Sequence, residues 1–428
     1  MIASPFLLSD PRSPWAHAND ASRITLDSDG IAQGDGVVPG LVAAGSRARY
    51  LTGSRVLDPG PRHPVALASA EALATSSRAW LVAGTVPGKG GPYEGMVTGA
   101  LLDMHALEMH DGASVAAWSA SWRYVWPRDA SFVAAAMAAT GHTDDALGIL
   151  SFLRDVQHPD GSFEARYLPD GSGPPDDRGV QSDGSGWVLW AAHAALAAVD
   201  DPDARTRAAM LLRPLIDRST RHILALTAGR GALPGASSDF WEERESVVTL
   251  GTAAPLLSGL EAAADLYRDL GARSASTRAA RRAADLRAAI VRAFGPRFAR
   301  YPGGEDRDAA SAFLLPPFQP TPVRGALSAW RASADEMARP AGGLSPGGGW
   351  REDGISWTPS TALYGLTAAW AGDATTSHAW LTWIDEHRTA SGAIPEKVLA
   401  DGSPAAAAPL AWSAACVVLA VAHLDQGL

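Results

Sequence analysis

The chain has 428 residues, a formal net charge of −10 and a hydrophobic content of 46%. This composition supports a sizeable core and excludes global disorder, and the acidic balance argues against nucleic acid as a partner. Cys416 is the single cysteine, so neither an intrachain disulfide nor a cysteine-based zinc site can form. The 15 tryptophans stand out, because flat indole rings suit both a protein core and the apolar faces of sugar rings.

The beginning of the chain lacks the basic residues and the long apolar stretch of a secretory leader, and no apolar run of about 18 residues occurs in the sequence. We therefore expect a soluble, cytoplasmic protein without a membrane partner. Residues 1–63 differ from the rest, because short apolar runs lie there between clusters of Gly, Pro, Ser and Asp. They predict an N-terminal arm of short strands or loops, ahead of a domain over residues 64–428.

From residue 64 onward, Ala-rich amphipathic segments alternate with loops that carry Gly, Pro and Trp. The pattern predicts helices over 64–84, 94–110, 129–140, 142–157, 184–200, 203–228, 245–270, 272–294, 307–315, 321–337, 358–371, 374–388 and 408–425.

Local signals support several of these boundaries. Residues 143–145 (Thr-Asp-Asp) precede an apolar run, as an N-cap does, and Gly271 follows the 245–270 segment, as a C′ glycine does. Thr321 before Pro322 is typical of a helix start. About a dozen helices with no series of strands between them predict an all-α domain of helical hairpins, arranged in a ring or a stack.

The long loops hold the motifs that can do chemistry. In the first, Tyr124 and Trp126 precede Arg128 and Asp129 at an expected helix start. The last two side chains place hydrogen-bond donors and acceptors side by side, which suits two vicinal hydroxyls of one sugar ring. The same pair can also be no more than a helix cap with a surface ion pair.

The second motif, residues 238–245, carries four acidic residues, among them Asp239, Glu242 and Glu243, together with Trp241. Carboxylates crowded against one another and against an indole ring lose solvation, so one of them should have a raised pKa and stay protonated near neutrality. A general acid needs that property. The alternative is an acidic first turn that complements a helix dipole.

A general acid calls for a second carboxylate, and Glu396 in the loop 391–397 is the candidate. It lies far from Glu242 in sequence, so only the fold can bring the two together, and a loop glutamate can also be plain surface. Gln181 and Asp183 lie in a polar loop that can bind substrate or cap the next helix.

Arg351 can contact substrate or pair with Glu352 or Asp353. Other chemistries find little support, since no phosphate-binding loop, dinucleotide fingerprint or zinc-protease motif occurs in a usable context. His105 and His110 lie five residues apart on an expected helix, which is poor spacing for a shared metal. We interpret them as core or surface residues and expect no metal site.

In their order and spacing, these segments resemble glycoside hydrolase family 15, the glucoamylase-type inverting exo-α-glucosidases. The matching segments are 99–102 (Gly-Ala-Leu-Leu), 124–129 (Tyr-Val-Trp-Pro-Arg-Asp), 181–184 (Gln-Ser-Asp-Gly), 239–243 (Asp-Phe-Trp-Glu-Glu), 395–397 (Pro-Glu-Lys) and 410–413 (Leu-Ala-Trp-Ser).

The resemblance covers roughly residues 65–428 and implies a six-hairpin (α/α)6 barrel that releases terminal glucose from α-glucosides without a metal or organic cofactor. It implies Glu242 as the general acid and Glu396 as the general base, with Asp239 supporting the acidic loop. The substrate contacts that it implies are Arg128, Asp129, Tyr124, Trp126, Gln181, Asp183, Trp241, Glu243 and Arg351.

Two departures from the family pattern bear on substrate. Trp122 stands where members often carry a tyrosine near the base. The N-terminal segment is too short for the large β-sandwich of many bacterial relatives, and we find no starch-binding module, so we expect short soluble oligosaccharides as substrates. The alternatives are a member specialised for trehalose or isomaltose, a non-catalytic sugar-binding barrel, and, least favoured, an α/α-toroid cyclase or lyase.

Overall fold

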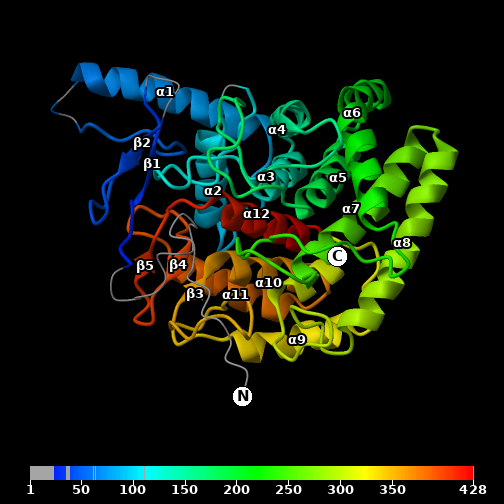
Figure 1. The fold of residues 1–428 in the computed structure, drawn as a ribbon. Coiled ribbons are helices and arrows are strands. Elements are labelled where there is room, and N and C mark those ends of the chain that lie inside the picture. The colour runs from blue at the N-terminus through cyan, green and yellow to red at the C-terminus, as the bar shows by residue number, and fades with distance from the viewer. Residues whose placement is uncertain (1–23, 35–38, 61, 63, 110, 428) are drawn as a thin grey trace.

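The computed structural model describes residues 24–34, 39–60, 62, 64–109 and 111–427. Helices dominate it, as the sequence predicts, and most of the expected ranges match to within three residues (Figure 1). They are α1 (Pro64–Ala83), α2 (Glu94–Leu107), α3 (Pro127–Ala139), α4 (Thr143–Val156), α5 (Asp183–Ala197), α6 (Pro202–Leu226), α7 (Leu250–Asp269), α8 (Arg273–Phe294), the 3-10 helix η3 (Ala309–Leu314), α9 (Ala326–Met337), α10 (Thr358–Trp370), α11 (Ala374–Glu386) and α12 (Ala411–Asp425).

Six of these elements form a closed inner ring. In ring order, α3 packs on α5, α5 on α7, α7 on η3, η3 on α10, α10 on α12, and α12 returns to α3. The inner helices α3, α5, α10 and α12 are buried along almost their whole length, because their sequences are apolar on every side. The helices α2, α4, α6, α8, α9 and α11 pack outside. Five of them pack on the inner element that precedes them in the chain (α4 on α3, α6 on α5, α8 on α7, α9 on η3 and α11 on α10), and α2 packs on α12, which makes six pairs of inner and outer elements. The predicted (α/α)6 barrel is confirmed.

Inner and outer elements alternate along the chain, so the N-terminal ends of the inner elements lie at one end of the barrel. Asp129 lies in the first turn of α3, and Asp183 begins α5. Thr249 caps α7, Asp308 caps η3, and Trp412 lies in the first turn of α12. Converging helix N-termini carry partial positive charge, which favours the carboxylates that collect there.

Two small sheets flank the barrel. In the arm, β1 (Gly30–Ala32) and β2 (Gly40–Val42) pair antiparallel. The second sheet has the order β3-β4-β5 and joins β3 (Ser356–Trp357), β4 (Lys397–Val398) and β5 (Pro404–Ala405). The sequence did not predict it, because strands of two residues leave no periodic pattern.

The described part of the arm packs on the barrel. Ile31 belongs to the main hydrophobic core. The guanidinium of Arg55 is buried against α2, where its Nη2 donates to Asp103 Oδ2 at 2.8 Å and to the Gly99 carbonyl at 2.9 Å. Leu26 forms a bridge to Ala406 beside the β4–β5 hairpin. The arm therefore supports the wall that carries Glu396.

Two predicted helix starts are wrong. Thr321 and Pro322 lie outside α9, which begins at Ala326 after Gly325 in the left-handed region at φ 88°. Glycine takes that conformation without a steric penalty, and it sets the start of the helix. Thr143 is the first residue of α4 rather than its cap.

Other boundary signals hold. Gly271 follows α7 with a φ of 69°, as the C′ prediction requires. However, α7 begins at Leu250 and not near residue 245, because the Thr249 side chain accepts from the Thr252 N–H and caps the helix there. The acidic motif therefore lies in the loop ahead of α7, outside its first turn.

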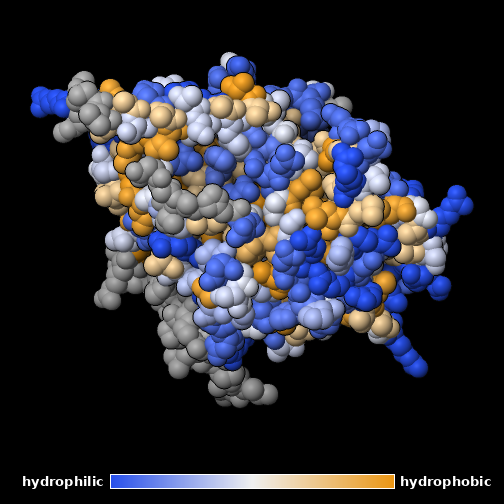
Figure 2. Space-filling view, turned by 90° about the horizontal axis from the view of Figure 1, so that it is seen from above, coloured by the Kyte–Doolittle hydropathy of each residue, from blue (hydrophilic) through white to orange (hydrophobic). Residues whose placement is uncertain are grey.

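The surface carries apolar residues in small groups among polar and charged ones on the face shown in Figure 2. Among the helices of the described residues, none combines the length and the apolar character needed to cross a bilayer.

Candidate active site

Arg128 is the centre of the carboxylate cluster at the inner helix N-termini. It is 4% exposed, and its Nη2 lies 3.1 Å from Asp129 Oδ2 and 3.4 Å from Glu242 Oε1. Its Nη1 lies 3.7 Å from Asp183 Oδ2. The guanidinium also lies over the Trp412 ring, 5.0 Å from its centroid. One cation therefore joins three buried carboxylates from three separate segments.

Glu242 is held from both sides of its carboxylate. Gln181 Nε2 donates to Oε1 at 3.0 Å, and Arg178 Nη1 donates to Oε2 at 3.1 Å. The backbone of Glu242 has a φ of 57°, in the left-handed region that only a few per cent of non-glycine residues occupy. Such a conformation costs about 1–3 kcal/mol and persists where the surroundings impose it, often at functional sites.

Asp239 and Arg300 hold the acidic loop in that conformation. The fully buried Asp239 accepts from the Trp241 N–H at 2.9 Å, from Thr249 Oγ1 at 2.6 Å and from Arg300 Nη2 at 3.0 Å. Arg300 also stacks over Trp241, 3.8 Å from the ring centroid, and pairs with Glu245. Burial raises the pKa of Glu245. Asp239 thus links the acidic loop to the start of α7 and to Arg300.

Indole rings line the small pocket next to this loop. Trp241 and Trp357 pack edge-on against Trp350, at centroid distances of 4.6 and 5.5 Å. The Nε1 groups of Trp126, Trp241 and Trp412 are buried and have no hydrogen-bond partner among the described residues. Buried donors normally have a partner, so these three donors lack the acceptor that such a group usually has. The pocket is lined by Phe240, Trp241, Pro346, Trp350, Trp357, Pro359, Ser360 and Trp412.

Glu396 lies between α10 and α12 and is 1% exposed. Its Oε1 lies 3.1 Å from Lys397 Nζ, and that ammonium lies 4.3 Å from the Trp357 ring centroid. The Glu396 carbonyl accepts from the Thr358 N–H at 3.0 Å, and Thr358 Oγ1 lies 2.7 Å from Ser413 Oγ. Burial raises the pKa of Glu396, and the Lys397 charge opposes that rise.

Each of the two candidate catalytic carboxylates adjoins the aromatic pocket through a neighbouring residue, and neither is among the residues that line it. Glu242 directly follows Trp241 in the wall, and the Lys397 partner of Glu396 rests on Trp357, another wall residue. Both carboxylates are buried at the end of the barrel where the inner helices begin.

The cluster also changes the protonation of its aspartates. Burial raises the pKa of Asp129 to about 6 and that of Asp183 to about 7, although Arg128 opposes both rises. The charge of Glu242 adds to each. Arg128 faces three buried carboxyl groups, so its immediate surroundings hold more carboxyl groups than cations.

The remaining predicted residues lie around this centre. Tyr124 and Trp126 contact the Arg166 guanidinium, at 4.3 and 5.1 Å from their ring centroids. Glu243 is more exposed, and its Oε1 lies 3.0 Å from Arg351 Nη2. The Arg351 side chain is therefore paired with the acidic motif.

Sequence reasoning missed four cations of the site: Arg166, Arg178, Arg300 and Lys397. Nothing local distinguishes the three arginines from the other arginines of the chain, because long loops bring them in. Lys397 had a signal, since it follows Glu396 directly. Among the described residues, one group of side chains is close enough to share a metal ion, and it lies apart on α2 and α4.

Several solved structures share this fold. A glycosidase aligns with a TM-score of 0.66 at 21% identity, over 77% of this chain and 96% of its own. A bacterial glucoamylase complexed with acarbose aligns with a TM-score of 0.67 at 16% identity, over 84% of this chain and 59% of its own. The glucoamylase from Saccharomycopsis fibuligera aligns with a TM-score of 0.60 at 15% identity, over 74% and 89%. The chain has the glucoamylase-type barrel fold.

That likeness is one of structure alone. No family model matches the chain, and no curated protein matches its sequence. The function therefore has to be inferred from the residues of the site.

Proposed function

We propose that this chain is a glycoside hydrolase that releases terminal glucose from α-glucosides with inversion at the anomeric carbon. The observation that carries the proposal is the Arg128 contact with Glu242 and Asp129 beside a wall of indole rings. Charged donors and acceptors next to flat aromatic faces suit a pyranose, which has hydroxyls around its edge and apolar C–H faces. The buried Nε1 groups of Trp241 and Trp412 supply further donors.

In the proposed reaction, Glu242 gives its proton to the glycosidic oxygen while the bond from that oxygen to the anomeric carbon breaks. Glu396 takes a proton from a water molecule, whose oxygen forms the new bond to the anomeric carbon from the opposite face. The products are β-glucose and the rest of the substrate, which keeps the glycosidic oxygen as a hydroxyl group. Proton transfer by two positioned carboxyl groups accounts for the chemistry without a metal ion or cofactor.

The charges around the site favour this transition state. Positive charge develops on the sugar ring as the bond breaks, and the excess of buried carboxylates around Arg128 stabilises it. Lys397 supports the base, because an ammonium 3.1 Å from Glu396 favours the ionised carboxylate that accepts the proton. We propose short soluble α-gluco-oligosaccharides as the substrate class.

The test is a panel of maltose, isomaltose, trehalose and soluble starch, with the released anomer followed by NMR. Because one glucoamylase of this fold was solved with acarbose, that compound is a suitable competitor. Release of β-glucose supports the proposal, whereas release of α-glucose would overturn the inverting mechanism. No release from any substrate, together with acarbose binding, would favour a sugar-binding function.

Isosteric variants separate catalysis from binding. We expect Glu242→Gln and Glu396→Gln each to lose at least about 10²-fold in kcat, the lower end of what general acid–base catalysis contributes. Binding of acarbose should be retained in both variants. Glu164→Gln is a matched control, because Glu164 is a half-buried glutamate in another ion pair, with His158. Turnover in the two variants at the rate of this control would exclude both residues as catalytic groups.

A further inference from the structure

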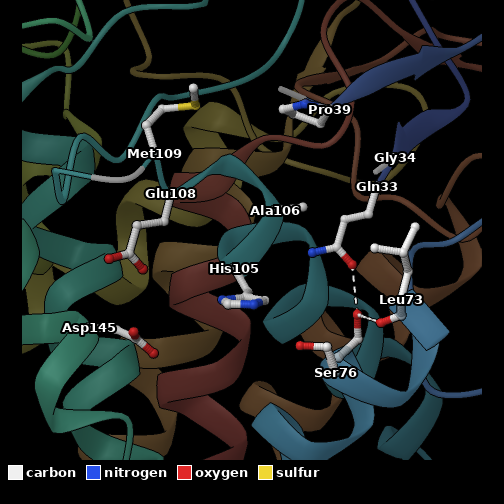
Figure 3. A pocket seen from close by; sticks show the side chains of 11 residues that line it. Gln33, Gly34, Pro39, Leu73, Ser76, His105, Ala106, Glu108, Met109 and Asp145 are labelled. Atoms are coloured by element: carbon white, nitrogen blue, oxygen red, sulfur yellow. Dashed lines mark hydrogen bonds between the residues drawn. The ribbon is translucent and has the colours of Figure 1, made fainter. Parts of the chain in front are cut away.

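A second cavity lies away from the carboxylate cluster, between the arm and the helices α1, α2 and α4. It has a volume of about 350 Å³, opens to solvent, and has polar walls at one end (Figure 3). His105, Glu108 and Asp145 form that end. The proposed hydrolase mechanism uses none of the three.

These three side chains come from two helices. His105 lies in the last turn of α2 and Glu108 at its C-terminal end, three residues apart, so they share one face of the helix. Asp145 lies in the first turn of α4. One ligand atom from each residue lies within 4.8 Å of the other two. Figure 3 shows the Glu108 and Asp145 carboxylates facing one another, with the His105 ring beside them.

Trp80 on α1 orients two of the three side chains. Its Nε1 donates to Asp145 Oδ2 at 2.7 Å, and its ring stacks on His105 at 4.1 Å between centroids, with the planes 14° apart. The opposite face of the same indole stacks on His142 at 3.8 Å, so Trp80 separates the two imidazoles. Contacts of this kind hold metal ligands in position in known sites.

Two ligand atoms lack a partner. His105 Nδ1 and Glu108 Oε2 are buried and accept or donate no hydrogen bond to any residue that the structure describes. A buried polar atom without a partner costs about 1–3 kcal/mol, so such atoms call for a ligand. A metal ion supplies one partner for both atoms at once.

We propose that His105, Glu108 and Asp145 bind one divalent transition-metal ion of the zinc class, with a remaining coordination position toward the cavity. An imidazole and two carboxylates are ligands that zinc accepts, and the two negative charges balance the charge of the ion. Ligand atoms at about 2.0–2.1 Å from zinc lie roughly 3.3 Å apart in a tetrahedral site. The ligand atoms lie within 4.8 Å of one another and would move closer when the ion binds.

The ion would tie the end of α2 to the start of α4. A long loop leads from the end of α2 to α3, whose first turn carries Arg128. Zinc uptake is measured without a substrate, so this site can be tested independently of hydrolase activity.

The experiment is calorimetric titration of the metal-free full chain with zinc chloride, repeated with cobalt chloride to record the absorption of bound cobalt. We expect one ion per chain and a higher Tm in zinc. Glu108→Gln and Asp145→Asn should each weaken binding at least about tenfold, because each removes a charged ligand.

The control is His158→Ala, which removes an imidazole that pairs with Glu164 elsewhere. This variant should take up zinc like the parent chain. Absence of zinc binding to the parent chain would overturn the proposal. Binding by the Glu108 and Asp145 variants at the parent affinity would also overturn it, because the ion would then sit at other residues. Circular dichroism shows that each variant is folded before titration.

Discussion

Arg128 Nη2 lies 3.4 Å from Glu242 Oε1, although the two residues are 114 positions apart in the chain. The first turn of α3 presents the guanidinium, and the strained loop ahead of α7 presents the carboxylate. Neither segment can form this contact alone. The contact therefore forms only when the barrel has closed and has brought the start of α3 next to the loop ahead of α7.

We predict that Arg128→Met destabilises the chain and that Arg128→Lys mainly impairs its function. Methionine leaves Asp129 and Asp183 buried without a cation, which costs about 3–5 kcal/mol of unfolding free energy. Lysine keeps the charge but loses the planar fork, so we expect kcat/KM to fall about 10²-fold with a small change in Tm. Denaturant unfolding and steady-state kinetics check the two effects. Parent-like kcat/KM in the lysine variant would contradict the positioning role.

The raised pKa of Asp183 predicts how stability depends on pH. Its pKa rises from 3.8 in the unfolded chain to about 7 in the folded one, mainly because of burial. The folded state then binds more protons than the unfolded state between about pH 4 and 7, so this group lowers the unfolding free energy as pH rises through that window. Above pH 7, where Asp183 is ionised in both states, the burial of its charge lowers the unfolding free energy by the full amount.

Asp183→Asn removes this penalty and keeps an oxygen that can accept from Trp187 Nε1. We expect the variant to gain stability relative to the parent chain as pH rises from 5 to 8. Thermal unfolding of both proteins across that range measures the difference. Asp203→Asn serves as the control, because Asp203 lies on the exposed first turn of α6. A pH-independent difference between the Asp183 variant and the parent would show that Asp183 ionises normally.

Much of the fold could be predicted from the sequence, because apolar periodicity reports which helices are buried. The start of α9 could not, because it depends on a left-handed glycine, Gly325, in a loop with other turn residues. The sheet that contains Lys397 could not be predicted either, because its strands of two residues are held by tertiary packing.

The residues of the candidate site also fall into those that could be predicted from the sequence and those that could not. Trp241 and Glu242 could be named from the local pattern of a compact motif, whereas Glu396 could be named only because that motif calls for a second carboxylate and because of the family resemblance. Arg178 and Arg300 could not, because each is an ordinary loop arginine until the fold brings it to a buried carboxylate. The conformation of Glu242 had no signal in the sequence, since a positive φ at a glutamate results from contacts with distant residues.

Lys397 predicts a change in the pH dependence of catalysis. Burial raises the pKa of Glu396, and the neighbouring ammonium limits that rise. Lys397→Met removes the opposing charge, so Glu396 stays protonated to higher pH and cannot act as a base there. We expect the acidic limb of the kcat/KM profile to move to higher pH. Lys89→Met, at an exposed loop position, should leave the profile unchanged. An unmoved acidic limb in the Lys397 variant would show that the charge does not act on Glu396.

The arm predicts an effect on stability through Arg55 and Asp103. This pair is buried where the arm meets α2, with side chains 8% and 2% exposed. Arg55→Met leaves an uncompensated carboxylate in the core, so we expect a loss of about 3–5 kcal/mol in unfolding free energy. The double variant Arg55→Met with Asp103→Leu should recover much of that loss, because an apolar pair has no charge to desolvate. Urea unfolding of the two single variants and the double variant gives the coupling free energy. Additive effects would show that the arm is held by contacts other than this ion pair.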